Sequence, residues 1–265
     1  MGHMGKEYKN TVPGNRDHLF YPALAILISA TGFAGFSFTY FGPILEGTYP
    51  PTGFALHLHG WSFFLWYLLF PLQATLMAAG KDSLHVILGK LSVILVTIMT
   101  LTGILVLTVR TEEAVRNGAP EIWLLYSPLI MSNLVLFVMF YTIGITMALK
   151  NRLQAHKRLI IVASAIGLGA GFFRLVLFLS GFHPLSLPIG VLSCSLFIVI
   201  GIIYDRISRG KVHRVYWIGL FTMLVVEVSL LPQLNGAFVE WLNQGLAVIG
   251  EYINYFYQPE PTVDF

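Results

Sequence analysis

The stretch LHVILGKLSVILVTIMTLTGILVLTV, residues Leu84–Val109, decides the class of fold. It is longer than the roughly 20 apolar residues that cross the hydrocarbon core of a bilayer, and Lys90 is the one Lys, Arg, Asp or Glu in it. The whole chain agrees, because 56% of its 265 residues are hydrophobic and 11% are charged. Soluble domains carry about 25% charged residues. We therefore expect an all-α bundle of transmembrane helices.

Six other apolar runs extend this prediction to a polytopic bundle of about seven spans. The expected spans are approximately Phe20–Phe41, Phe54–Met77, Leu84–Val109, Ile122–Leu149, Leu159–Ser180, Leu185–Tyr204 and Val215–Leu231. The chain then divides into an N-terminal cytoplasmic segment 1–19, the seven-span domain 20–231 and a tail 232–265. The opening MGHMGK is typical of a cloning remnant, so His3 is excluded from functional reasoning.

The loop charges predict how the bundle is oriented. Lys and Arg gather before the first span and in the second, fourth and sixth connections, whereas the first and fifth connections hold neither. The positive-inside rule then places the N-terminus in the cytoplasm and the C-terminus outside. We expect an integral membrane protein, located in the bacterial inner (plasma) membrane. The net charge of +3 is too small and dispersed for a nucleic-acid partner, and a lone Cys194 allows no disulfide framework.

The tail differs from the spans in its pattern of apolar residues. Between Asn235 and Tyr257 they recur at helical spacing, while most polar residues fall elsewhere on the helical wheel. This pattern predicts an amphipathic helix lying on the outer membrane face. Because the segment lacks Lys and Arg, a helix that caps the bundle is an alternative, and a partly ordered tail is another.

Four of the eight histidines stand at or just beyond the ends of expected spans. By depth they form two layers: His59 with His57 and His183 on the outer side, and His85 and His156 with His213 on the cytoplasmic side. Imidazole near a bilayer usually faces the bundle interior or a polar cavity, and it is a common ligand of metals and haem. The alternatives are hydrogen bonds to neighbouring helices and contacts with lipid phosphate.

Four other polar residues are expected inside the bundle, and they suggest a buried network. They are Gln73, Asn133, Arg174 and Glu227. Arg174 and Glu227 lie at similar depth, and because an unpaired charge there is costly, we expect them to pair. Such a pair fits a proton or ion relay, a clamp on an anionic group such as a haem propionate, or a structural lock.

The two layers of histidines on different helices resemble the transmembrane two-haem cytochromes b, and the ascorbate-dependent family most of all. In that family each haem iron takes one histidine from each of two helices. The resemblance implies that His85 and His156 hold a cytoplasmic-side haem b, and His59 with His183 an outer one. The chain departs from the respiratory cytochromes b in having no helix with two widely spaced histidines, and His183 falls in a short loop.

The chain also resembles a broad group of bacterial multi-span integral membrane proteins that carries no assigned activity. The matching pieces are HLHGWSFFLWYLLFPLQATL from His57, LHVILGKLS from Leu84 and HKRLIIVAS from His156. They cover roughly half the chain. This resemblance supports His59, Gln73, His85 and His156 as residues to test.

The favoured function is a b-type haem protein that transfers electrons, an oxidoreductase-type carrier without a defined catalytic residue. One alternative is a small-molecule or ion transporter or sensor that uses Arg174, Glu227 and Asn133. Another is a membrane-embedded metal enzyme with a divalent ion at His59, His85 and His156, and a structural subunit without a cofactor is a third. Expected partners are the lipid bilayer, a redox partner and a second copy of the chain. A retinal protein is excluded, because the last span has no lysine for a Schiff base.

Overall fold

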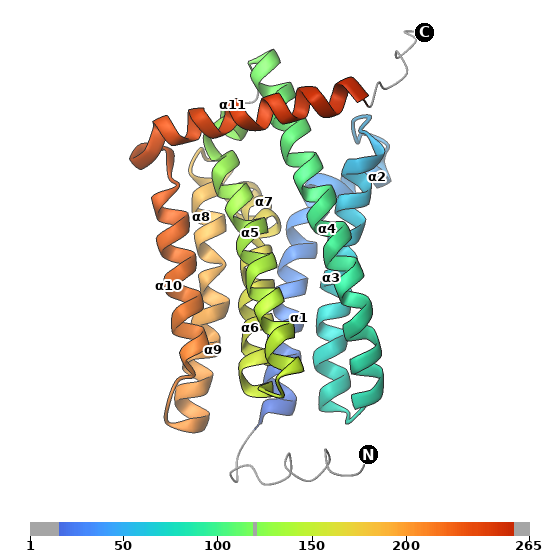
Figure 1. Cartoon of the computed structure of the whole chain (residues 1–265), viewed down its shortest axis with the longest axis vertical. Coiled ribbons are helices and arrows are strands. Elements are labelled where there is room, and N and C mark those ends of the chain that lie inside the picture. Colours follow the sequence, from blue (N-terminus) through green and yellow to red (C-terminus); the bar gives the residue numbers. More distant parts are fainter. Residues whose placement is uncertain (1–15, 119–120, 257–265) are drawn as a thin grey trace.

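The computed structural model describes residues 16–118 and 121–256, which are helical almost throughout and contain no strand (Figure 1). The expected N-terminal segment therefore lies mostly outside the described residues. The elements are α1 (Asp17–Phe36), the π-helix η2 (Ser37–Phe41), α2 (Gly42–Glu46), α3 (Phe54–Ala78), α4 (Asp82–Asn117), α5 (Glu121–Leu149), α6 (Leu153–Gly167), α7 (Gly169–Leu179), α8 (Ser186–Ser193), α9 (Ser195–Arg209), α10 (Arg214–Ser229) and α11 (Pro232–Phe256).

The expected all-helical membrane protein is confirmed. By length and composition, five stretches can each cross a bilayer: 17–46, α3, α4, 123–149 within α5, and 186–209, which joins α8 to α9. Two pairs of helices are bent, α6 with α7 by 46° and α10 with α11 by 83°. The described residues thus hold five to seven spans, and the expected seven are reached only when each bent pair counts as one span.

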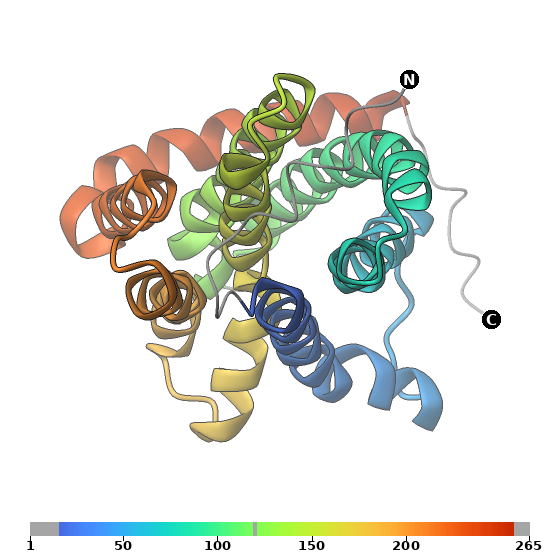
Figure 2. The same ribbon diagram turned by 90° about the horizontal axis from the view of Figure 1, so that it is seen from below.

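The polar residues are located below by the end of the bundle at which they lie. At the lower end in Figure 1, helices α4, α6 and α10 begin and α9 ends; α11 runs across the upper end. Seen from below, α6 is central, with α3 and α4 to one side and α9 and α10 to the other (Figure 2). The aromatic and aliphatic core fills the spaces between these helices, and the outward faces of the spans carry many exposed apolar side chains, as lipid contact requires.

The tail forms the expected helix, and α11 caps the bundle. It packs against α4 and α5, and its Asn243 Nδ2 donates to the Leu124 carbonyl at 2.6 Å. Farther along, Asn254 Nδ2 donates to Glu112 Oε2 at 3.0 Å. These bonds satisfy polar groups at the ends of α4 and α5 and fix α11 across them.

Small residues let α1 and α7 cross closely. A Cβ on Gly35 would collide with the backbone carbonyl of Gly171, and a Cβ on Gly171 would lie 3.0 Å from Gly32 Cα. Such contacts are how membrane helices pack, since apolar side chains gain little over lipid from mutual burial. A backbone atom cannot turn aside as a side chain does, so the crossing depends on these glycines.

We expect Gly35→Ala to lower the free energy of unfolding by about 1–3 kcal/mol, because its methyl group must push two backbones apart. The matched control is Gly60→Ala in α3, where the nearest atom to a new Cβ is a side-chain carbon of Phe64 at 3.9 Å. Both are helical glycines, so the gain in helix propensity is similar. Denaturant titration in mixed micelles measures both, and equal stability of the two variants would show that the crossing is not tight.

Candidate cofactor site

His85 and His156 come together at the lower end of the bundle. Each lies in the first turn of its helix, α4 or α6, and these helices begin at the same end of the bundle. Their ring centres are 6.3 Å apart and their planes make an angle of 79°. The structure therefore joins two of the histidines that the sequence placed in one layer.

Hydrogen bonds orient both rings in the same way. His85 Nδ1 lies 3.3 Å from the Gln73 carbonyl oxygen, and His156 Nδ1 lies 2.9 Å from that of Gly144. A carbonyl only accepts, so in both neutral rings Nδ1 carries the proton and donates it. Each Nε2 then keeps a lone pair, and within the described residues neither makes a hydrogen bond. A backbone carbonyl on the far nitrogen is the usual support of a metal-binding histidine.

The two rings line a cavity of about 60 Å³ between α3, α4, α5 and α6. Its walls are mostly apolar and include Trp66 and Tyr141. Gln73 also lines it and donates through Nε2 to the His85 carbonyl at 3.2 Å, while its buried Oε1 has no hydrogen-bond partner. Buried polar atoms rarely stay unpaired. The site therefore offers two imidazole nitrogens and one amide oxygen to a ligand.

The separation of the rings fits two ligands of one metal. An ion bound by Nε2 at about 2.0–2.1 Å lies roughly 3.2 Å from the ring centre. Opposite rings are then roughly 6.4 Å apart, and rings at the tetrahedral angle roughly 5.2 Å. The observed separation of 6.3 Å is within the span of two imidazole ligands of a single metal.

His59 occupies a different place, toward the upper end. It lies roughly 21 Å along α3 from Gln73, at about 1.5 Å per residue. Its Nδ1 is 3.2 Å from Thr102 Oγ1, which itself donates to the Ile98 carbonyl. The predicted metal set of His59, His85 and His156 is therefore not one site. Among the described residues, no three His, Cys, Asp or Glu side chains are placed to hold an ion.

The remaining outer histidines have local roles. His183 lies exposed between α7 and α8, and its Nδ1 accepts from the Leu185 amide at 3.2 Å. In the neutral ring Nε2 then carries the proton, so it offers no lone pair. Both nitrogens of His57 are engaged, by Tyr40 Oη and Thr52 Oγ1 at 3.0 Å each. The expected outer pair of His59 and His183 makes no mutual contact in the described structure.

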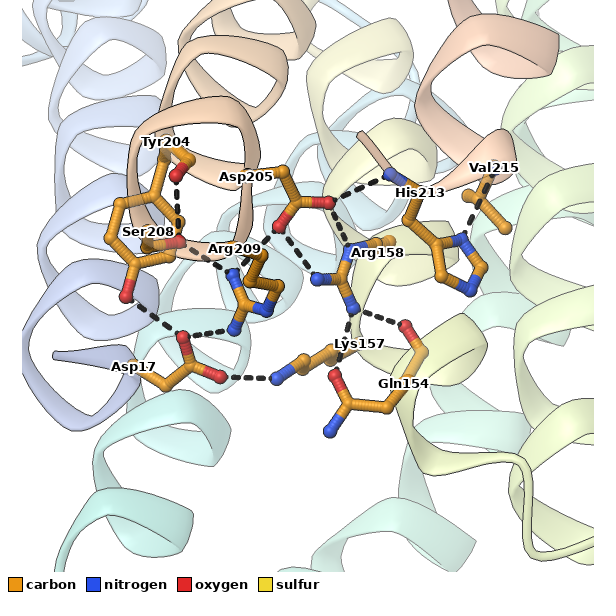
Figure 3. A network of polar contacts seen from close by, with 10 residues as sticks. All are labelled: Asp17, Gln154, Lys157, Arg158, Tyr204, Asp205, Ser208, Arg209, His213 and Val215. Carbon is orange, nitrogen blue, oxygen red and sulfur yellow. Dashed lines mark hydrogen bonds and ion pairs between the residues drawn. The ribbon is translucent and has the colours of Figure 1, made fainter. Parts of the chain in front are cut away.

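The residues that follow His156 enter an ion-pair network, shown in Figure 3. Arg158 is buried and binds both carboxylate oxygens of Asp205 on α9, through Nε at 2.8 Å and Nη2 at 2.6 Å. Only 1% of the Arg158 side chain and 0% of the Asp205 side chain are exposed. Bidentate geometry makes this pair strong and directional, and it ties α6 to α9.

Asp17 extends the network to α1. It binds Lys157 Nζ at 2.5 Å, accepts from Tyr204 Oη at 2.8 Å and pairs with Arg209. Arg209 also reaches Asp205, at 2.8 Å. Three cations and two carboxylates thus join α1, α6 and α9 at the lower end of the bundle.

His213, which precedes α10, adds a further contact to the network. Its amide donates to Asp205 Oδ2 at 3.1 Å, and its Nδ1 accepts from the Val215 amide as the helix cap. Burial, and next the charge of Arg158, lower the pKa of His213 below its ordinary value. A neutral ring is also what the cap requires, because only unprotonated Nδ1 accepts.

This network was not predicted from the sequence. Lys157, Arg158 and Arg209 fall among the loop cations that set the expected orientation, and Asp17 was not expected to pair with them. The signal available was Asp205, a lone acid beside a basic loop and directly after an apolar span.

The expected pair of Arg174 and Glu227 does not form. Arg174 Nη1 donates to the Ala170 carbonyl at 2.8 Å, and its guanidinium lies 4.6 Å from the centre of the Phe36 ring. Both carboxylate oxygens of Glu227 are buried without a hydrogen-bond partner, as is Asn133 Oδ1. Depth alone had suggested the pair, but the side chains face different neighbours.

Comparison with family models, curated proteins and solved structures found no match to this chain. Function is therefore inferred from the chemistry of the site.

Proposed function

We propose that this integral membrane protein binds one haem b between His85 and His156 and carries electrons. The observation that carries the proposal is the ring separation of 6.3 Å, with each Nδ1 bonded to a backbone carbonyl. Bound haem would supply a one-electron carrier. The chain would hold it through the Nε2 atoms of His85 and His156, keep both rings oriented and surround the site with apolar side chains that exclude water.

The two histidines are suitable ligands for haem iron, but the cavity is too small for the porphyrin ring as it stands. Two neutral imidazoles with free Nε2 atoms are a regular donor set for haem iron. The cavity of about 60 Å³ is smaller than a porphyrin, so the side chains along its wall must move apart to admit one. Trp66 and Tyr141 line that wall and would stack against or flank the ring.

A bare transition-metal ion at the same two histidines is the second candidate. The small cavity favours it, and so does Gln73 Oε1, a buried acceptor without a partner that could add a third ligand atom. Imidazole nitrogen suits zinc, copper, iron and nickel. This candidate needs no movement of the side chains along the cavity wall.

One preparation distinguishes the two candidates. The protein is expressed with ample haem precursor, purified in mild detergent, and its absorption spectrum is recorded after air oxidation and after dithionite reduction. We expect a Soret band, sharp reduced α and β bands, and one haem per chain by pyridine haemochrome assay. A featureless spectrum with one metal ion per chain would select the second candidate. A featureless spectrum without metal would remove both.

A further inference from the structure

A second group of buried polar residues, apart from the His85–His156 site, lies nearer the upper end of the bundle. It forms one level across the helices, directly beneath a compact apolar cluster. This upper cluster consists of buried Tyr126, Leu129, Leu187 and Val191, packed against Ile130, Phe173 and Leu231. It joins α5, α7 and α8 to the residues after α10. Because α5 and α8 run downward while α7 and α10 run upward (Figure 1), the residues one turn below it can be read from the chain.

Four helices bring small or polar residues to that level. Asn133 lies one turn below Leu129, Cys194 below Val191, Gly169 below Phe173, and Glu227 below Leu231. Two of them are in direct contact, because a Cβ on Gly169 would collide with Asn133 Oδ1.

The level contains buried acceptors that lack donors. Glu227 is 0% exposed, and neither of its carboxylate oxygens has a hydrogen-bond partner. Asn133 Oδ1 is also unpartnered, although its Nδ2 donates to the Leu129 carbonyl at 2.8 Å. A bare carboxylate is very costly in such surroundings. A positive charge or a hydrogen-bond donor would therefore stabilise the oxygens of Glu227 and Asn133.

Two helices change their winding at the same level. Between α6 and α7, the Leu168 amide bonds to Ala165 O, and the Gly171 amide to Leu168 O. Between α8 and α9, the Cys194 amide bonds to Val191 O, and the Phe197 amide to Cys194 O. These are three-residue steps inside otherwise four-residue ladders, and mid-helix turns of this kind often mark functional hinges. Membrane proteins commonly place ion sites at interrupted helices.

We propose that Glu227 is a reversible proton-binding site inside the bundle. The carboxylate takes one proton from solvent, an O–H bond forms, and the negative charge is neutralised without breaking another bond. The new O–H is a hydrogen-bond donor, which the unpartnered oxygens of Glu227 and Asn133 lack. Proton uptake thus removes the buried charge and supplies the missing donor together. The site is separate from the His85–His156 pair and does not depend on bound haem.

Infrared spectroscopy of the full chain in nanodiscs tests this site. Wild-type protein is expected to show a carboxylic-acid C=O band at neutral pH that shifts in deuterated water and disappears on alkalinisation. The band is expected to be lost in Glu227→Gln, which keeps the side-chain shape. Glu240→Gln is the matched control, because Glu240 is exposed on α11, and it is expected to leave the band unchanged.

Three results would overturn the proposal. They are the absence of the band from wild-type protein, its persistence in folded Glu227→Gln, and its loss when Na⁺ is added at constant pH, which would make the level a metal-cation site. If Glu227→Gln does not fold, Asn133→Leu provides the second variant. It removes a neighbouring dipole, so the wild-type band is expected to change frequency, and an unchanged frequency would contradict a shared level.

Discussion

Replacing Asp205 with alanine is expected to lower the free energy of unfolding by about 3–5 kcal/mol, because Arg158 is left buried without its carboxylate. Asp205 accepts two bonds from Arg158 and others from Arg209 and the His213 amide. Its loss therefore frees donors on α6, α9 and the segment before α10 together. Unfolding in mixed micelles, followed by circular dichroism, measures the change.

Glu113→Ala is the matched control for Asp205→Ala. Glu113 pairs with Arg110 at 2.7 Å on the surface, where the two side chains are 44% and 47% exposed. Exposed pairs contribute about 0–1 kcal/mol. A further variant, Arg158→Met with Asp205→Leu, is expected to recover much of the loss, since it removes the unpaired charge. Equal stability of Asp205→Ala and Glu113→Ala would mean that the buried pair does not hold the bundle.

Replacing His156 with leucine is expected to abolish haem binding, if the proposed function holds. The substitution would remove one of the two histidines that would hold the haem iron, and a single histidine would hold it less firmly. His85→Leu is expected to give the same result, because the two rings line one cavity and their centres are 6.3 Å apart. The haem content per chain and the reduced α band measure the loss.

His183→Asn is the matched control, since His183 is exposed and its Nδ1 already accepts from a backbone amide. It is expected to retain one haem per chain. Two haems in wild-type protein, with one lost in His183→Asn, would restore the outer pair of His59 and His183 suggested by resemblance. Full retention of haem in His156→Leu would contradict the proposed ligands.

The candidate site was predictable in part. The sequence placed His85 and His156 at the same end of the bundle, because both open spans that follow basic loops. Nothing in it indicated that the first turns of α4 and α6 would bring the two rings to one cavity, and α5 separates these helices in the chain. Likewise, Arg174 and Glu227 share a depth but face different neighbours. Depth follows from counting residues, whereas the direction of a side chain around the bundle axis does not.

The membrane class, the helical content and the helical tail follow from the sequence alone, because apolar length and helical spacing are properties of a continuous segment. The contacts of Asp17 with Lys157 and Arg209, the pair of Arg158 with Asp205 and the position of α11 across the bundle end emerge only in the folded chain. These contacts join residues that lie far apart in the chain. Which helices become neighbours depends on the close fit of many small surfaces, such as Gly35 on Gly171, which no local pattern encodes.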